Sequence, residues 1–202
     1  MTNRLSIFPL TGALLFPGMH LPLHIFEPRY RALVRDALAR DRRIGMVQPR
    51  DTSEPPTLFD MGCVGRIAEV EALADGRFDI VLEGVSRFRI VRELDVTTPF
   101  RQVEAELIAS GADETLSLGE RAALEMESRR FAELQGYAVD WEAVSRLDDE
   151  ALVNGIAQIA PFDAASKQAL LEADSLGARS ELILQLMHFY GRYGDDDDAT
   201  LQ

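Results

Sequence analysis

Two histidines, His20 and His24, stand four residues apart around Pro22, in a segment whose apolar run favours an extended backbone. Even spacing in an extended segment places both imidazoles on one face, where they could bind a metal ion. A metal site needs further ligands, and the sequence offers no nearby third carboxylate or thiolate beside this pair. We therefore expect hydrogen bonding to backbone or water and predict no metal. His188, in an expected C-terminal helix, is given a structural role.

The candidate nucleophiles lack the partners that catalysis requires. Cys63 is the single cysteine, which excludes an internal disulfide and favours a buried thiol, since no base is positioned for it. Ser166 and Lys167 are adjacent in a helical pattern, so their side chains diverge and cannot form a nucleophile–base pair. No G-x-x-x-x-G-K-[ST] loop is present to bind phosphates. The sequence therefore predicts no catalytic residue, no cofactor and no enzyme activity.

A run of arginines could bind RNA, but its charge context favours another interpretation. Asp36 and Asp41 interrupt the run, and the chain has a net charge of −13, which opposes non-specific binding to nucleic acid. An ion-paired, solvated helix face is the expected role, and nucleic acid is not the expected partner. The arginines concerned are Arg29, Arg31, Arg35, Arg40, Arg42, Arg43 and Arg50.

Apolar side chains gather around a predicted tight turn at Pro17-Gly18. Proline presets φ at the first central position of a type II turn, and glycine accepts the positive φ of the second. One short turn cannot bury all of its apolar neighbours unaided, so any exposed subset would form a polypeptide-binding surface. The candidates for that surface are Leu15, Phe16, Met19, Leu21 and Leu23.

The elements that would position these residues are strands in the first half of the chain. Asp75-Gly76 predicts a hairpin between strands near 64–73 and 78–82. Further strands are expected at 87–91 and 102–107, and a loop at 50–56. One helix begins at Glu27-Pro28, with Pro at its first position. Its buried face should comprise Tyr30, Leu33, Val34, Ala37 and Leu38.

The second half reads as helices after a boundary at 110–113. Ser117 and Glu120 form a capping box, and Asp140, Asp148 and Asp163 suit three further N-caps. Apolar stripes are expected at Leu152, Ile156 and Ile159, and at Leu182, Ile183, Leu186 and Tyr190, the second ending before Gly191. The fold class is α+β. The predicted parts are a β-rich lobe at 1–110, an α-helical lobe at 111–192 and a disordered acidic tail at 193–202.

Two ordered blocks resemble a known family. FPL at 8–10, LFPG at 15–18 and LPLHIFEPRYR at 21–31 are similar to the opening of the substrate-binding N-terminal domain of Lon, the ATP-dependent protease. GCVGRI at 62–67 with DGRFDIVLEGVSRF at 75–88 is similar to its central hairpin. The resemblance implies a small, partly open, PUA-like β-barrel with one helix, followed by an α-helical bundle. It also implies a structural motif at Glu27, Pro28, Arg29 and Tyr30, anchoring the helix to the barrel.

The resemblance implies a non-catalytic role: binding of unfolded or hydrophobic polypeptide segments, as an adaptor or regulator in proteolysis and protein quality control, with a protease or other protein as partner. Lon's ATPase and protease motifs are absent from the sequence. RNA or nucleotide binding by the barrel is the alternative, and an unrecognised small-molecule enzyme is a third. No run of about 18 apolar residues and no apolar leader occurs, so we expect a cytoplasmic protein without membrane association.

Overall fold

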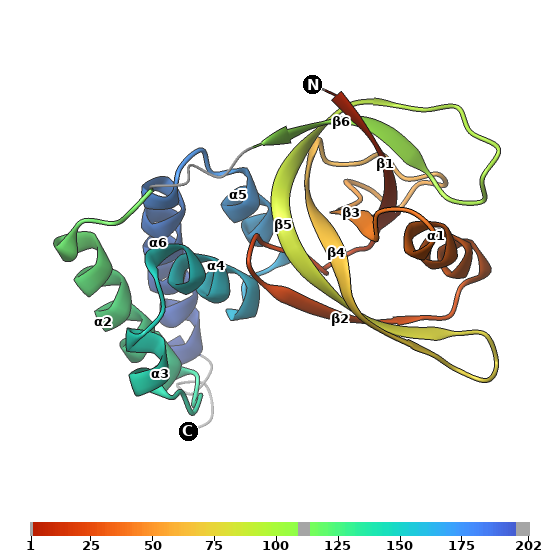
Figure 1. Cartoon of the computed structure of the whole chain (residues 1–202). Helices are drawn as coiled ribbons and strands as arrows, with labels where there is room; N and C mark the ends of the chain where they lie inside the picture. Colours follow the sequence, from red (N-terminus) through yellow and green to blue (C-terminus); the bar gives the residue numbers. More distant parts are fainter. Residues whose placement is uncertain (1, 109–113, 197–202) are drawn as a thin grey trace. The chain divides into compact units, whose positions relative to one another are not determined.

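The computed structural model describes residues 2–108 and 114–196, which fall into two compact units, Met1–Ser110 and Gly111–Gln202 (Figure 1). Among these described residues, the first unit contains a mixed sheet and one helix and the second contains only helices, so the α+β class is confirmed. The strands of the first unit are β1 Thr2–Pro9, β2 His20–Ile25, β3 Arg43–Val47, β4 Met61–Ala72, β5 Phe78–Glu93 and β6 Gln102–Ile108.

The strand order in the sheet is β2-β5-β4-β3-β1-β6, and β5 pairs additionally with β6. Five strands therefore close a hydrogen-bonded ring through β5, and β2 lies outside that ring as an edge strand on the first half of β5. Of the strand pairs in the described part of the chain, only β1 and β3 run parallel. The edge position of β2 agrees with Pro22, which cannot donate a backbone hydrogen bond. The finer assignment to a partly open, PUA-like barrel stays a prediction.

The prediction of two separate strands in the region of β5 was wrong. The segments expected at 78–82 and 87–91 belong to one strand of 16 residues, Phe78–Glu93. Its register against β4 shifts twice, between Val64 and Gly65 and between Ile67 and Glu69. Such irregularities bend a strand without ending it. The first part of β5 can therefore pair with β2 and its last part with β6, while β4 pairs along most of its length. The hairpin before it is confirmed: Gly76 has φ +81° and its amide donates to the carbonyl of Leu73 at 2.9 Å.

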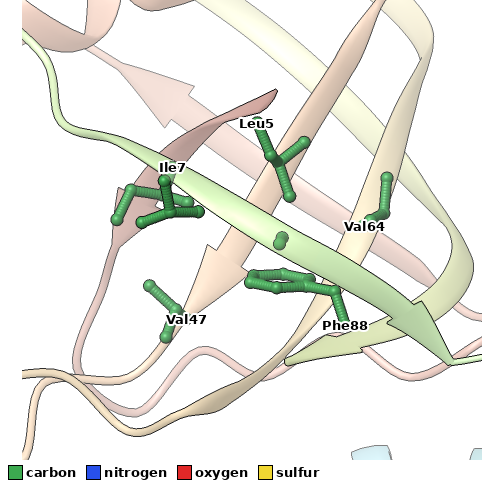
Figure 2. Close-up of a cluster of buried hydrophobic side chains, with 7 residues drawn as sticks. Leu5, Ile7, Val47, Val64 and Phe88 are labelled. Carbon is green, nitrogen blue, oxygen red and sulfur yellow. The ribbon is translucent and has the colours of Figure 1, made fainter. Parts of the chain in front are cut away.

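The core of the first unit fills the inside of the ring. Figure 2 shows side chains from different strands pointing toward one another, with the ring of Phe88 among them. Every member is at most 7% exposed, so the cluster removes apolar surface from water at roughly 25 cal/mol per Å². Its members are Leu5, Ile7, Val47, Val64, Phe88, Val103 and Ala105.

The helix expected at Glu27-Pro28 is α1, Pro28–Leu38, with proline in its first turn. Tyr30 attaches it to β1: its ring lies 4.0 Å from that of Phe8, and its hydroxyl donates to the carbonyl of Pro9 at 3.3 Å. Leu33, Val34 and Ala37 are buried beside it, as the helical spacing predicted, while Leu38 is half-buried.

The second unit begins each of four helices with the cap that the sequence predicted. Ser117 and Glu120 form the capping box, and the three aspartates accept backbone N–H groups at their helix starts. Arg179 is buried, and its guanidinium donates to the Asn154 side chain at 2.7 Å and to the Leu170 carbonyl at 2.8 Å. The helices are α2 Leu118–Leu134, α3 Trp141–Ser145, α4 Asp149–Ile159, α5 Ala164–Glu172 and α6 Leu176–Asp196.

Two helical expectations were wrong, the first at a single residue. Of the stripe expected on α4, Leu152 is buried and Ile156 is half-buried, but Ile159 is 80% exposed. The buried residues of this helix are Leu152, Val153, Asn154 and Ala157. The last helix does not end before Gly191 but runs to Asp196, so the predicted tail at 193–202 begins within α6, and its residues 197–202 lie outside the described part of the chain. No helix among the described residues has the length and apolar character needed to cross a membrane.

Candidate polypeptide-binding surfaces

The turn at Pro17-Gly18 forms as predicted and is held against β5. Gly18 has φ +75°, and the Met19 amide donates to the Phe16 carbonyl at 3.1 Å, which closes the turn. Two further backbone hydrogen bonds join Gly18 and Met19 to Gly84 of β5, at 2.9 and 2.8 Å. The turn is thereby a fixed platform from which β2 starts.

Burial divides the five apolar candidates. Leu15 and Phe16 are 1% and 0% exposed, so both belong to the core and are removed from the candidate surface. Met19, Leu21 and Leu23 are half-buried and retain accessible surface. The sequence could not separate the two groups, because all five are apolar and only the contact between turn and β5 decides which of them is covered.

An apolar row crosses three strands at Leu23. In the sheet register Leu23 of β2 faces Ile80 of β5, and Ile80 faces Val70 of β4. Directly paired residues on neighbouring strands share one face, so their side chains form a continuous strip. Ile80 is buried, whereas Val70 is 39% exposed. A shallow hollow of about 400 Å³ lies over these strands. We call Leu23, Ile80 and Val70, with the neighbouring Leu21 and Met19, the β2 surface.

Three polar side chains beside the β2 surface contact one another. His24 Nδ1 lies 2.5 Å from Asp79 Oδ1, and its Nε2 lies 3.3 Å from Arg77 Nη1. Phe26 stacks on His24 with 6.2 Å between ring centroids and is 60% exposed, so it extends the apolar area; the sequence reasoning had missed it. Within the described residues no group of three His, Cys, Asp or Glu side chains could hold a metal ion.

The motif at Glu27 to Tyr30 anchors α1 through Tyr30. The Arg29 guanidinium donates to the Glu27 carboxylate at 2.9 Å, and their side chains are 55% and 38% exposed. The pair is partly exposed, and the Arg29 guanidinium lies over the Tyr30 ring at 4.7 Å from its centroid, so an anchoring role for the pair stays a prediction. Tyr30 has that role, and burial raises the pKa of its hydroxyl.

Four of the seven arginines considered for RNA form ion pairs with nearby acids, Arg29 with Glu27 as described above and three others. Arg40 pairs with Asp36 at 3.0 Å, Arg43 with Asp41 at 4.0 Å and Arg50 with Asp60 at 3.1 Å. A surface that attracts phosphates needs uncompensated positive charge. These ion pairs agree with the expected solvated, ion-paired face.

A second hollow, of about 560 Å³, lies against the loop at 50–57. Asp51 fixes this loop by accepting hydrogen bonds from Ser53 and Thr57, which hold the pKa of its carboxyl below the usual range. Arg101 lines the hollow, donates to the Pro56 carbonyl at 2.8 Å and lowers the pKa of Glu93 by pairing with it. The Asp51 and Arg101 side chains of this hollow are thus already paired within the protein.

The remaining nucleophile candidates are structural. Cys63 is fully buried in β4, as expected. Lys167 Nζ donates to the Gln158 carbonyl at 2.7 Å, and partial burial lowers the pKa of this lysine. The Ser166 amide donates to the carboxylate of Asp163, the N-cap of α5. His188 of α6 lies 3.5 Å from the carboxylate of Glu127, which belongs to α2. None of these groups contacts another as a nucleophile and base would.

The helical unit contains an apolar pocket that the sequence reasoning did not find. It has a volume of about 210 Å³ and lies among α2, α3 and α4, with Met187 of α6 in its wall. Tyr137, Val139 and Trp141 line one side. Their alternation with Ala138 and Asp140, just before and at the start of a predicted helix, was the one available signal.

Comparison with known proteins decides the family. The family model described as the ATP-dependent protease La (LON) substrate-binding domain matches residues 4–188. The chain belongs to this family. Two relatives are Lon protease 2 of Myxococcus xanthus, 32% identical over 195 residues, and Lon protease 2 of Desulfotalea psychrophila, 30% identical over 198 residues. The matches cover 91% and 93% of this chain but 23% and 25% of the relatives, so this LON-domain chain spans about a quarter of their length.

Solved structures agree on the fold. The Lon N-terminal domain protein from Xanthomonas campestris superposes with a TM-score of 0.70 at 23% identity, covering 91% of this chain and 98% of that one. The N-terminal domain of the Mycobacterium avium complex Lon protease gives a TM-score of 0.69 at 20% identity, covering 92% and 98%. At these identities the likeness concerns the fold alone. It agrees with the resemblance found in the sequence.

Proposed function

We propose that this chain is a non-catalytic, cytoplasmic polypeptide-binding protein that holds unfolded or hydrophobic segments on the β2 surface. The observation that carries the proposal is membership of the LON substrate-binding domain family over residues 4–188. We assign a PUA-like barrel to the first unit, on the basis of the closed ring of strands and of the solved relatives.

The β2 surface suits apolar segments because its members are apolar side chains, several of them accessible. Leu23 and Val70 flank the buried Ile80, and Pro22 removes a backbone donor from the edge strand, which weakens pairing with an added strand. Binding should therefore rely on apolar contact with half-buried side chains. We expect a weak affinity, on the order of micromolar, because a few such contacts barely exceed the cost of association.

A role as adaptor or regulator in proteolysis follows as part of the proposal. The relatives are Lon proteases, and the present sequence contains no phosphate-binding G-x-x-x-x-G-K-[ST] loop. Polypeptide held by this chain would then be passed to, or withheld from, a separate protease. The pure protein should hydrolyse neither ATP nor unfolded casein.

Titration of labelled unfolded polypeptide and labelled RNA at two salt concentrations tests the proposal. Polypeptide binding should be nearly independent of salt, because apolar contact releases no counterions, whereas RNA binding should fall steeply with salt. Leu23→Asp should weaken polypeptide binding at least tenfold. Val91→Ser is the matched control, since Val91 is 53% exposed on β5 but lies beyond the segment that pairs with β2.

Three results would contradict the proposal. Binding confined to RNA and suppressed by salt would favour the nucleic-acid alternative. Equal effects of Leu23→Asp and Val91→Ser would show that the β2 surface is not the site. Absence of binding to either ligand would leave a dedicated protein partner as the remaining explanation.

A further inference from the structure

The apolar pocket of the helical unit has the size of an anchor site. Its volume of about 210 Å³ lies below the roughly 300 Å³ at which drug-sized ligand sites begin. Buried side chains form its floor, among them Phe131, Leu152 and Met187, which are 4%, 2% and 3% exposed. A single large apolar side chain is the ligand that such a space accepts.

Two polar side chains in the wall are already hydrogen-bonded within the protein. The Ser128 hydroxyl donates to the Leu124 carbonyl at 2.7 Å, and the Glu125 carboxylate accepts from Arg121 at 2.9 Å. An apolar group can therefore enter beside them without taking a hydrogen-bond partner from either side chain. The chemistry of the wall favours an aliphatic or aromatic side chain.

The rim of the pocket is apolar and open to solvent. None of the residues of α3 is buried, although Trp141 and Val144 of this helix line the pocket. Ile159, Tyr137 and Leu147 stand around it with 80%, 49% and 41% exposure. An exposed cluster of large apolar side chains around an open hollow is typical of an interaction site.

The charge of this unit selects the kind of partner. Residues 114–191 carry 14 acidic and 6 basic side chains. Of the basic ones, Arg121, Arg130 and Arg146 form ion pairs, and Arg179 is buried. Arg129 lies over the ring of Trp141 at 4.6 Å from its centroid and is the one cation that we place against the pocket wall. The negative charge in excess therefore favours a positively charged partner.

We propose that this pocket binds a basic polypeptide segment, by inserting one large apolar side chain that is flanked by lysine or arginine. The apolar side chain would fill the space above Phe131 and Leu152, and the flanking cations would interact with the acidic surface of the unit. The site is distinct from the β2 surface, which belongs to the other unit and whose binding should not depend on salt.

The same charge opposes the other occupants. A second copy of this chain carries −13 and would bring two acidic units together, and nucleic acids and anionic membranes are repelled for the same reason. A neutral apolar compound would bind without regard to salt. These alternatives give different results in one experiment.

Trp141 provides the direct measurement, because it is the single tryptophan of the chain and lines the pocket. The probe is a short Trp-free peptide with one central Phe flanked by lysines. It should change the emission of Trp141 saturably, and its affinity should fall as salt rises. Replacing the lysines by glutamate, or the Phe by Ser, should weaken binding at least tenfold.

Matched variants locate the site. Ile159→Ser and Leu147→Ser should each lower the affinity for the Lys-flanked peptide at least fivefold. Leu118→Ser removes a 90% exposed apolar residue that does not line the pocket and should leave the affinity unchanged. Leu23→Asp on the β2 surface should also leave it unchanged, so this inference and the proposed function can fail separately. Circular dichroism confirms that each variant is folded.

The proposal would be overturned by equal affinity for the Glu-flanked peptide, by unchanged binding in both pocket variants, or by constant Trp141 emission at high peptide concentration. Salt-independent binding of the peptide would show that apolar contact alone acts. A dimer of the protein that Ile159→Ser dissociates would identify a second copy as the occupant.

Discussion

A Cβ atom on Gly84 would lie 2.0 Å from the carbonyl oxygen of Phe16. This approach is closer than any carbon–oxygen contact allows, so the turn that starts β2 fits against β5 only because residue 84 has no side chain. The same close approach of the two backbones allows the Gly84 amide to donate to the Met19 carbonyl at 2.8 Å. The position of β2, and with it the β2 surface, therefore depends on one glycine in a different strand.

Gly84→Ala should accordingly destabilise the protein by about 2 kcal/mol or more, since the added methyl group meets backbone that cannot rotate away. Urea unfolding measured by circular dichroism gives the free energy of unfolding. Gly119→Ala is the control, because nothing lies within 4 Å of a Cβ there and alanine suits a helix better than glycine. A Gly84→Ala protein as stable as the control would refute the packing of the turn.

Tyr30→Ala should cost about 3 kcal/mol of unfolding free energy, whereas Glu27→Ala and Arg29→Ala should each cost less than about 1 kcal/mol. Tyr30 is 7% exposed and packs on Phe8, while the side chains of Arg29 and Glu27 are 55% and 38% exposed, and exposed ion pairs contribute little. Parallel chemical denaturation of the three variants measures this ranking. A larger loss from Glu27→Ala than from Tyr30→Ala would show that the Glu27–Arg29 pair holds α1 in place.

Asn154→Leu should destabilise the helical unit by about 2 kcal/mol. Asn154 is fully buried and its side-chain oxygen accepts from the Arg179 guanidinium at 2.7 Å. Leucine has the same branched shape but no acceptor, so a buried cation would lose a hydrogen bond that solvent cannot replace. The double variant with Arg179→Met should recover part of the loss. No recovery in this double-mutant cycle would mean that the two side chains are not coupled.

Local signals predicted the elements, and long-range contacts decided which side chains are accessible. Some signals act over only a few residues and can be recognised in the sequence: Pro28, the capping box at Ser117 and the Asp75-Gly76 turn. The burial of Phe16 depends on Gly84, nearly seventy positions away, and the exposure of Ile159 depends on which face α4 packs. Periodicity marks apolar residues but cannot tell a covered stripe from an open rim, which is why the helical pocket was missed.

The stability of the helical unit should depend on pH through Asp149. Its carboxylate accepts from the Arg121 guanidinium at 2.5 Å and from the Leu116 amide at 2.8 Å, and these bonds hold its pKa below the usual value. Because the folded pKa is lower than the unfolded value of about 3.9, the carboxylate stabilises the fold above about pH 4 and loses this effect as pH falls through its folded pKa.

Asp149→Asn should therefore be clearly less stable than the wild type at pH 7, and the difference should narrow as the pH falls below about 4. Glu142→Gln is the matched control in the same unit: Glu142 and its partner Arg146 have side chains 79% and 72% exposed, and the loss should stay small at every pH. Urea unfolding at pH 7, 5 and 3.5 measures both differences. A stability gap for Asp149→Asn that stays constant from pH 7 to 3.5 would show that the ionised carboxylate is not what joins α4 to Arg121 of α2.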